Sequence, residues 1–231
     1  YWPADLHVIG KGISRCHAIY WPAMLLSAGL ATPKSIFVHG YVSAGGQKMS
    51  KSLNNVVDPF NLIHSYGADA VRYYLLREIP PAEDGDYSEE KFINCYNAHL
   101  ANDLGNLVSR VSNMVERYLD GIVPAIELPD PEYALEDVYT LISQYRFNEA
   151  LDTVWSIVRL ANKVVDDEKP WELFNNSNLD KLNLVLAQLV VMVQDIALAL
   201  EPFLPDTYKT IQQHFNQTKL SKIPPLFPRI L

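Results

Sequence analysis

Gly45-Gly46-Gln47-Lys48-Met49-Ser50-Lys51-Ser52 (residues 45–52) is the most informative stretch of this sequence. A β-rich run over residues 35–42 precedes it, and helical sequence follows it. The paired glycines lower the cost of unusual backbone dihedral angles and allow a loop to close. The pattern predicts a mobile loop with two lysines between a strand and a helix. The alternative is a solvated Lys/Ser loop on a hairpin.

The sequence on the amino-terminal side of this loop predicts an α/β segment. The expected elements are a buried strand over 6–9 bounded by Gly10, a helix from Ile13 to about Ala28 that Pro22 kinks or divides, and a second strand over 35–42. A strand, a crossover helix and a strand form a right-handed βαβ unit with parallel strands. Ligands bind beyond the carboxyl ends of such strands, where Gly10 and the segment after Val42 lie.

From Asp58 onward the sequence is mostly helical. Asp58 is expected to N-cap a helix that begins at Pro59, with another helix over 70–78, a loop over 80–86 and a long helix starting at 88–91. Apolar residues then follow helical spacing in three stripes: Leu100, Leu104, Leu107, Val111 and Met114; Phe147, Leu151, Val154, Val158, Ala161 and Val165; Leu186, Leu189, Val190, Val193, Ile196 and Leu200. Because three stripes cannot be buried separately, we expect a bundle of about four or five helices, with 224–228 packed on a surface as an extended segment.

Composition limits the classes of function. The formal net charge of −8 argues against a generic nucleic-acid coat, although a local patch can still bind RNA. Two cysteines, Cys16 and Cys95, make neither a disulfide framework nor a zinc-spaced cluster, so we expect no metal site in this chain and a reducing, cytoplasmic location. Asp195 interrupts the longest apolar run, and we expect no membrane partner.

The loop resembles the KMSKS signature of class I aminoacyl-tRNA synthetases, and its flanks resemble the methionyl members. Residues 2–24, WPADLHVIGKGISRCHAIYWPAM, are similar to the family stretch HxIGKDIxxFHxIYWPA. Further matches are FVHGY at 37–41, DGDYS at 84–88, GNLVSR at 105–110, KPW at 169–171 and PLFPRI at 225–230. The resemblance covers nearly the whole chain.

The resemblance implies a mostly α fold. It predicts a partial Rossmann-like α/β segment with the KMSKS loop over 1–57, a connecting helical segment over 58–87 and an α-helical-bundle anticodon-binding domain over 88–231. The family's second signature, H-x-G-H, is missing from this sequence. We therefore expect the C-terminal half of the enzyme, inactive in amino-acid activation without the N-terminal half of the catalytic domain.

The resemblance also implies which residues meet ATP, supplied with Mg²⁺ as a substrate. Lys48 and Lys51 would follow the negative charge that grows on the departing pyrophosphate, and Ser50 and Ser52 would add hydroxyl donors. The family's other ATP contacts match Gly10, His39 and Val42, the last through its backbone. A plain strand role is the alternative for His39 and Val42.

Methionine binding is implied for Ile13 and His17, which share a helix face at i, i+4 spacing. The alternative for His17 is a core histidine with a hydrogen-bond partner. Two departures affect this site: Gly12 replaces the usual Asp, whose carboxylate is a ribose hydrogen-bond acceptor, and Cys16 replaces the usual Phe. We expect compensation elsewhere or reduced affinity for methionine and ATP. Packing is favoured over nucleophilic chemistry for Cys16.

Recognition of the CAU anticodon of methionine tRNA is implied for Asn106, Arg110, Pro170 and Trp171. Asn106 and Arg110 lie off the apolar stripe of their helix and can read base edges, and an exposed Trp171 can stack on a splayed base. The alternatives are a solvated helix face for the first two and packing at a helix start for Trp171.

Three functions compete. The favoured one is a part of a methionine–tRNA ligase, whose partners are methionine, ATP and methionine tRNA. The second is a non-catalytic tRNA-binding module derived from a class I synthetase, which Gly12 and the missing H-x-G-H string motivate. The third is a helical scaffold without an RNA role, which the KMSKS string disfavours.

Overall fold

The computed structural model describes residues 2–50 and 55–230 and divides into two compact units. Unit 1 comprises residues 1–57 and 78–88, and unit 2 comprises residues 58–77 and 89–231. A unit boundary therefore falls between Val57 and Asp58, where the character of the sequence changes. Residues 58–87, predicted to form one connecting segment, are shared between the two units.

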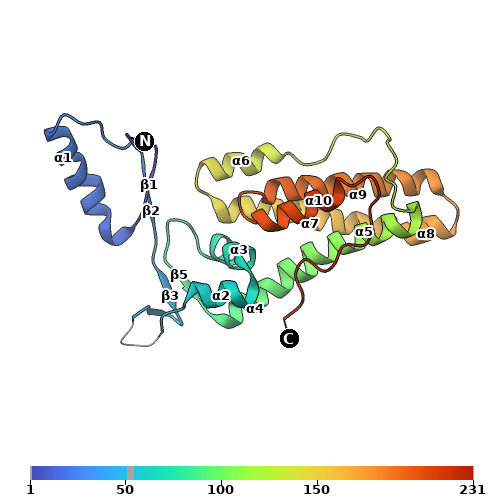
Figure 1. Cartoon of the computed structure of the whole chain (residues 1–231), viewed down its shortest axis with the longest axis horizontal. Helices are drawn as coiled ribbons and strands as arrows, with labels where there is room; N and C mark the ends of the chain where they lie inside the picture. The colour runs from blue at the N-terminus through green and yellow to red at the C-terminus, as the bar shows by residue number, and fades with distance from the viewer. Residues whose placement is uncertain (1, 51–54, 231) are drawn as a thin grey trace. The chain divides into compact units, whose positions relative to one another are not determined.

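Unit 1 is built on the predicted parallel βαβ arrangement (Figure 1). Strand β1 (His7–Gly10) pairs with β2 (Ile36–His39) in parallel, with His7 opposite Ile36 and Gly10 opposite His39. The connecting helical path comprises a 3₁₀ turn, Lys11–Ile13, a π-helical segment, Cys16–Tyr20, and α1, Trp21–Ser27. The predicted division of this helix is confirmed, since α1 starts just before Pro22, a residue without an N–H group to donate.

The expectation of a single strand over 35–42 is wrong. The chain leaves the β1–β2 sheet after His39 and enters a second sheet of β3 (Val42–Ala44), β4 (Gln47–Lys48) and β5 (Gly85–Tyr87), in the order β4-β3-β5. The break falls at Gly40, where a Cβ atom would lie 1.8 Å from the backbone oxygen of Glu83. Only glycine allows two backbones to approach this closely.

The expected loop over 80–86 is also partly wrong, because β5 begins at Gly85. This strand pairs in parallel with β3, placing Gly85 opposite Val42 and Asp86 opposite Ser43. β5 is three residues long and its partner is about forty residues away in the sequence. A short strand of this kind carries almost no periodicity of its own, so local pattern does not reveal it.

Unit 2 is helical throughout its regular structure. Its helices are α2 (Pro59–Tyr66), α3 (Ala68–Glu78, of which the last residue belongs to unit 1), α4 (Glu89–Cys95), α5 (Asn106–Leu119), α6 (Leu135–Ser143), α7 (Phe147–Glu168), α8 (Pro170–Asn175), α9 (Leu179–Leu200) and α10 (Pro205–Phe215). A π-helical segment, Tyr96–Gly105, joins α4 to α5, so the predicted long helix runs on from 89 to 119. The Asp58 cap is confirmed, because its carboxylate accepts a hydrogen bond from the backbone N of Phe60 at 2.9 Å.

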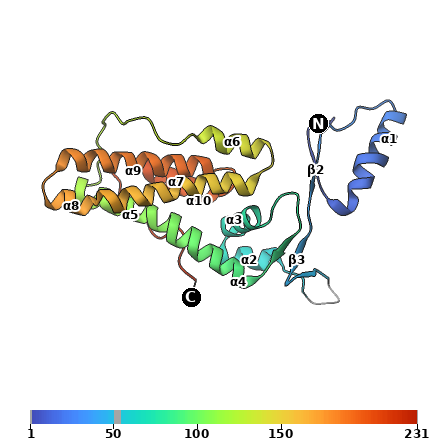
Figure 2. The same cartoon turned by 180° about the vertical axis from the view of Figure 1, so that it is seen from behind.

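The three predicted stripes form the core of this bundle. Figures 1 and 2 show α6, α7, α9 and α10 alongside one another, and α7 and α10 both pack on α9. All the stripe residues are buried except Phe147, which is only half-buried at the start of α7. The tail is extended and packs on the bundle as expected, with Ile223 and Phe227 buried. The predicted fold, a short α/β segment followed by a helical bundle, is confirmed.

Helix α3 holds the corner between α9 and α10 through two charged side chains. Asp69 accepts hydrogen bonds from the backbone N and the hydroxyl of Thr207, both at 2.7 Å, in the first turn of α10. Arg72 donates to the backbone oxygens of Pro202 and Phe203 at 2.7 and 2.8 Å, just beyond the end of α9. The two charges complement the helix dipoles, negative at a helix N-terminus and positive near a C-terminus.

Helix α9 is long and apolar enough, by length and composition alone, to cross a membrane. Its most apolar 18-residue window is 61% buried inside the bundle. That burial is typical of the central helix of a bundle, whose apolar surface is covered by its neighbours.

Candidate functional site

The carboxyl ends of β1 and β2 bring two of the predicted ligand-binding residues together in unit 1. Gly10 and His39 are the last residues of the two parallel strands and lie opposite each other. A Cβ atom at Gly10 would lie 3.5 Å from the imidazole Cε1 of His39, so the glycine leaves that ring room beside the backbone. The His39 Nδ1 is 2.8 Å from its neighbouring Gly40 oxygen, which fixes the direction of the ring.

The signature stretch begins on the β3–β4 hairpin of unit 1. Gly45 and Gly46 form its turn, with φ angles of 61° and 72° that favour glycine. Asp86 on β5 accepts hydrogen bonds from the Ser43 hydroxyl at 2.6 Å and from the Gly46 backbone N at 2.7 Å. A carboxylate from the third strand of the sheet therefore anchors the turn that leads into Lys48, a contact that no local sequence pattern indicates.

Asn55 closes the base of the loop. Its side-chain oxygen accepts from the Ser50 backbone N at 2.7 Å, and its side-chain nitrogen donates to the Lys48 backbone oxygen at 3.2 Å. Lys51 and Ser52 lie outside the described residues. Of the predicted loop residues, Lys48 and Ser50 are therefore placed, both held by the same amide side chain.

A second charged contact fixes the segment between the two sheets of unit 1. The Lys11 ammonium pairs with the Asp84 carboxylate, lying 2.6 Å from its Oδ1, and the same Oδ1 accepts from the Tyr41 backbone N at 2.7 Å. The hydrogen bond from Lys11, followed by that from Tyr41, lowers the pKa of Asp84. Asp84 and Asp86 belong to the DGDYS stretch, in which no local sequence pattern indicates the role of either carboxylate.

Ile13 and His17 are brought together on one side of the helical path after β1. The His17 Nδ1 lies 3.1 Å from the Ile13 backbone oxygen, which orients the imidazole. Its ring meets that of His7 edge to face at a centroid distance of 6.0 Å. Ile13 is half exposed and Cys16 is exposed, so this surface offers an apolar contact beside an imidazole.

Unit 2 has a polar groove where α5 meets α7. It has a volume of about 500 Å³ and contains Asn106 and Arg110 together with Asn102, Asp103, Arg159, Asn162, Lys163, Asp166 and Asp167. Asn106 is exposed and Arg110 is partly exposed, which confirms that both flank the buried stripe. Arg110 Nη2 donates to Asp166 Oδ1 at 2.8 Å. Amide, guanidinium and carboxylate groups of this kind bind the edges of unstacked bases.

Pro170 and Trp171 stand at the start of α8, after Lys169 in a left-handed conformation with φ of 43°. Pro170 is buried, whereas Trp171 is 37% exposed. Neither residue lines the groove that contains Asn106 and Arg110. The structure thus places the four predicted RNA contacts on two helices, with one pair in a groove and one aromatic side chain at a helix start.

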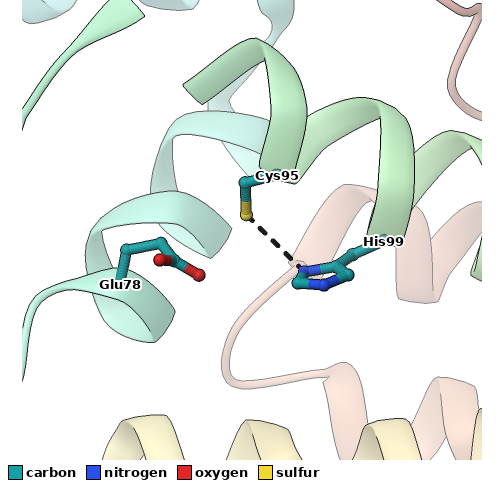
Figure 3. Close-up of side chains that lie close together, drawn as sticks. All are labelled: Glu78, Cys95 and His99. Carbon is teal, nitrogen blue, oxygen red and sulfur yellow. Dashed lines mark hydrogen bonds between the residues drawn. The ribbon is translucent and has the colours of Figure 1, made fainter. Parts of the chain in front are cut away.

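Cys95 and His99 form a partly buried polar contact in unit 2 (Figure 3). The Cys95 Sγ and the Tyr73 hydroxyl lie 3.6 and 3.0 Å from the same His99 Nδ1. Burial, followed by the positive charges of Arg77 and Arg159, lowers the pKa of His99 to about 4. The thiol and the imidazole are side chains of the types that ligate zinc, and Arg77, one of the two cations beside them, is itself paired with Asp152 at 2.7 Å.

Methionine–tRNA ligases are among the known proteins that this chain resembles in sequence and in structure. The family model described as class I tRNA synthetases (M) matches residues 1–112. A methionine–tRNA ligase of Thermotoga maritima is 43% identical over 91% of this chain and 35% of its own length, and one of Synechocystis is 42% identical over 94% and 43%. The chain thus spans about two-fifths of the length of these curated relatives.

A crystal structure supports the same relationship. The structure of Mycobacterium tuberculosis methionyl-tRNA synthetase bound by methionyl-adenylate aligns with 99% of this chain and 50% of its own, with a TM-score of 0.91 and 37% sequence identity. Its apo form aligns with a TM-score of 0.87 and 34% identity. At 37% identity the two proteins are similar in sequence as well as in fold.

Proposed function

Because the chain belongs to the class I (M) family of tRNA synthetases, we propose that it is the part of a methionine–tRNA ligase that carries the signature loop and reads the anticodon. The observation that carries this proposal is that the KMSKS string begins on the β3–β4 hairpin of unit 1. Its first lysine lies on β4, and the turn before it is anchored by Asp86. An anchored turn that leads into a sequence with two lysines suits a ligand with several negative charges.

For activation of methionine, we assign Mg²⁺-ATP as the substrate of the loop. Lys48 and Lys51 would stabilise the charge on the departing pyrophosphate, with Ser50 and Ser52 as donors. Gly10, His39 and the Val42 backbone would contact the nucleotide beyond the strand ends, and Ile13 and His17 would contact methionine. The pairing of Gly10 with His39 and the hydrogen bond between Ile13 and His17 support these two groupings.

We further propose that activation needs a part of the catalytic domain that this chain does not contain. The curated relatives are more than twice as long as the segment that matches them, and the H-x-G-H string is not in this sequence. The chain alone should show no methionine-dependent exchange of pyrophosphate into ATP. Such exchange, catalysed by the purified chain, would contradict this proposal.

For tRNA, we assign CAU recognition to Asn106, Arg110, Pro170 and Trp171. The groove around Asn106 and Arg110 is lined by amides and charged groups and is open to solvent. The pairing of Arg110 with Asp166 holds the guanidinium in place before a base arrives, which reduces the entropy lost on binding. The exposed indole of Trp171 offers a face for one unstacked base.

The decisive test is fluorescence anisotropy of a labelled hairpin with the CAU anticodon, titrated beside a hairpin with that triplet changed. We expect tighter binding of the CAU hairpin. Trp171→Ala should weaken it by about 5- to 150-fold, the loss expected for one base–aromatic stack, and Arg110→Ala should reduce the preference for CAU.

Arg146→Ala is the matched control. Arg146 is also exposed and paired with a carboxylate, that of Glu149. It precedes α7, whereas Asp166 is near the other end of that helix, about 30 Å away at 1.5 Å per residue. Equal affinities for the two hairpins, or an equal loss in Arg110→Ala and Arg146→Ala, would refute the assignment.

A further inference from the structure

The Tyr41 hydroxyl occupies the space that a side chain at position 12 would need. A Cβ atom built on Gly12 would lie 2.4 Å from the Tyr41 Oη, but 3.5 Å from its Cζ. The first distance is a clash, and the second is an ordinary contact. The hydroxyl is therefore the group that a larger residue 12 would clash with, and because it is bonded to the ring, relief of the clash would move the ring as well, whereas a ring without the hydroxyl would not clash.

The ring of Tyr41 is a platform for two ammonium groups. Lys11 Nζ lies 4.6 Å from the ring centroid, and Lys48 Nζ, of the signature loop, lies 5.8 Å from it. Both distances fall within the range of cation–π attraction. Asp84 pairs with Lys11, which offsets the repulsion between the two cations. Lys48 makes no ion pair with any residue that the structure describes, so the ring is its electrostatic partner there.

The backbone of Tyr41 is held firmly enough for this purpose. Its N–H donates to Asp84 Oδ1 at 2.7 Å, and its carbonyl oxygen accepts from the Gly85 N at 2.9 Å. The residue thus links β5 to the segment between β2 and β3. Because the Tyr41 backbone is fixed at its N–H and its carbonyl, the ring restricts the Lys48 side chain. Less rotamer entropy of Lys48 is then lost when a ligand binds.

We propose that Tyr41 is a positioning residue for Lys48, and that glycine at position 12 is what allows it to take this place. The inference rests on the proposed function of the signature loop as a polyphosphate site. In this arrangement the Tyr41 ring holds the Lys48 ammonium at the hairpin before the ligand arrives. The compensation expected for the missing Asp at position 12 is then Tyr41, whose hydroxyl fills the space beside Gly12 and whose ring positions Lys48.

Proton NMR of the chain tests the platform directly. An ammonium-bearing chain over an aromatic face has its εCH₂ protons shifted upfield, and Lys48→Arg identifies the resonance. We expect an upfield shift for Lys48 but none for Lys34, an exposed lysine that pairs with Asp5. The shift should persist in Tyr41→Phe and disappear in Tyr41→Leu.

The pair of variants at position 12 excludes a merely structural role. Gly12→Ala should displace the ring and reduce the Lys48 shift, whereas Gly12→Ala combined with Tyr41→Phe should restore it, because the nearest remaining atom is then at 3.5 Å. A Lys48 resonance at the position of Lys34, or a Gly12→Ala spectrum that matches the wild type, would overturn the inference. The restored double variant also excludes misfolding as the cause of the loss.

Inorganic tripolyphosphate, added to the same samples, separates this inference from the proposed function. Loss of a cation–π contact at an exposed site corresponds to an affinity about 2- to 5-fold weaker in Tyr41→Leu, with Lys34→Ala unchanged. An upfield-shifted Lys48 that ignores tripolyphosphate in every sample would refute the role of the loop and support the platform. An equal affinity in wild type and Tyr41→Leu would refute the positioning role.

Discussion

Replacing Asp69 by alanine should remove the contact that holds α10 against α3. Asp69 is 7% exposed, and its Oδ2 accepts two hydrogen bonds at 2.7 Å, from the backbone N and the hydroxyl of Thr207. The variant leaves the buried N–H without its acceptor in the first turn of a helix. Unit 2 contains both residues, so its stability reports the loss.

The magnitude follows from the number and kind of bonds. A hydrogen bond to a charged acceptor contributes about 1.5–3 kcal/mol, which sets an upper limit of about 3–6 kcal/mol for two. The Asp69 Oδ1 is buried and has no hydrogen-bond partner among the described residues, so removing the carboxylate also removes a desolvation cost. We therefore expect Asp69→Ala to lower the free energy of unfolding by about 2–4 kcal/mol.

Urea unfolding followed by circular dichroism at 222 nm, a wavelength that reports helix, measures this change. Asp69→Asn keeps a neutral acceptor of the same shape and should cost about half as much. Asp206→Asn is the matched control, because Asp206 is an exposed acid in the first turn of the same helix. A loss in Asp69→Ala below about 0.5 kcal/mol, or one equal to that of Asp206→Asn, would refute the reasoning.

Three further outcomes are expected. Asn55→Ala removes both hydrogen bonds at the base of the loop, so hydrogen exchange of the Ser50 amide should accelerate by about 5- to 150-fold, and an unchanged rate would contradict the clamp. Burial lowers the pKa of His99 to about 4, so the neutral imidazole contributes stability that is fully present above pH 6.5 and is lost as the pH falls toward 4. The free energy of unfolding should therefore fall by up to about 1.4 kcal/mol per pH unit in this range. Urea unfolding at several pH values measures this slope, which His99→Gln should abolish. Gly40→Ala should disrupt unit 1, because the new Cβ atom would lie 1.8 Å from a backbone oxygen. In Gly29→Ala the new Cβ atom meets nothing within 4 Å, so stability should fall only by the strain of a φ angle of 69°. Thermal unfolding of the two variants compares these losses.

The parts of the fold that depend on local pattern were predictable. The Asp58 cap is a contact between neighbours in the sequence, and the stripe through Leu100 and Leu104 follows from helical periodicity. The break at Gly40 was not predictable, because the cause is the backbone of Glu83, which lies in another segment. Phe147 continues an apolar stripe by spacing, but it is the first residue of its helix and is only half-buried.

In the candidate site too, some features were predictable from the sequence and others were not. The KMSKS string, the GNLVSR stretch and the tryptophan after Pro170 were visible as residue types in order, and they indicated the family before any geometry was known. The anchors of the loop were not visible. Asp86 accepts a hydrogen bond from Gly46, 40 positions away in the sequence. Asn55 belongs to no sequence motif, and only the structure shows that its amide joins Lys48 to Ser50.

By itself the sequence determined the helical stripes, the parallel βαβ unit and the chemical identity of the loop, because each of these depends on residues close together in the chain. Only the tertiary structure decided which carboxylates hold the hairpin, which aromatic ring lies beside Lys48, and that Asp69 caps a helix 138 positions away. Such contacts depend on how distant segments pack, and a short polar residue carries no periodic signal that reports its partner.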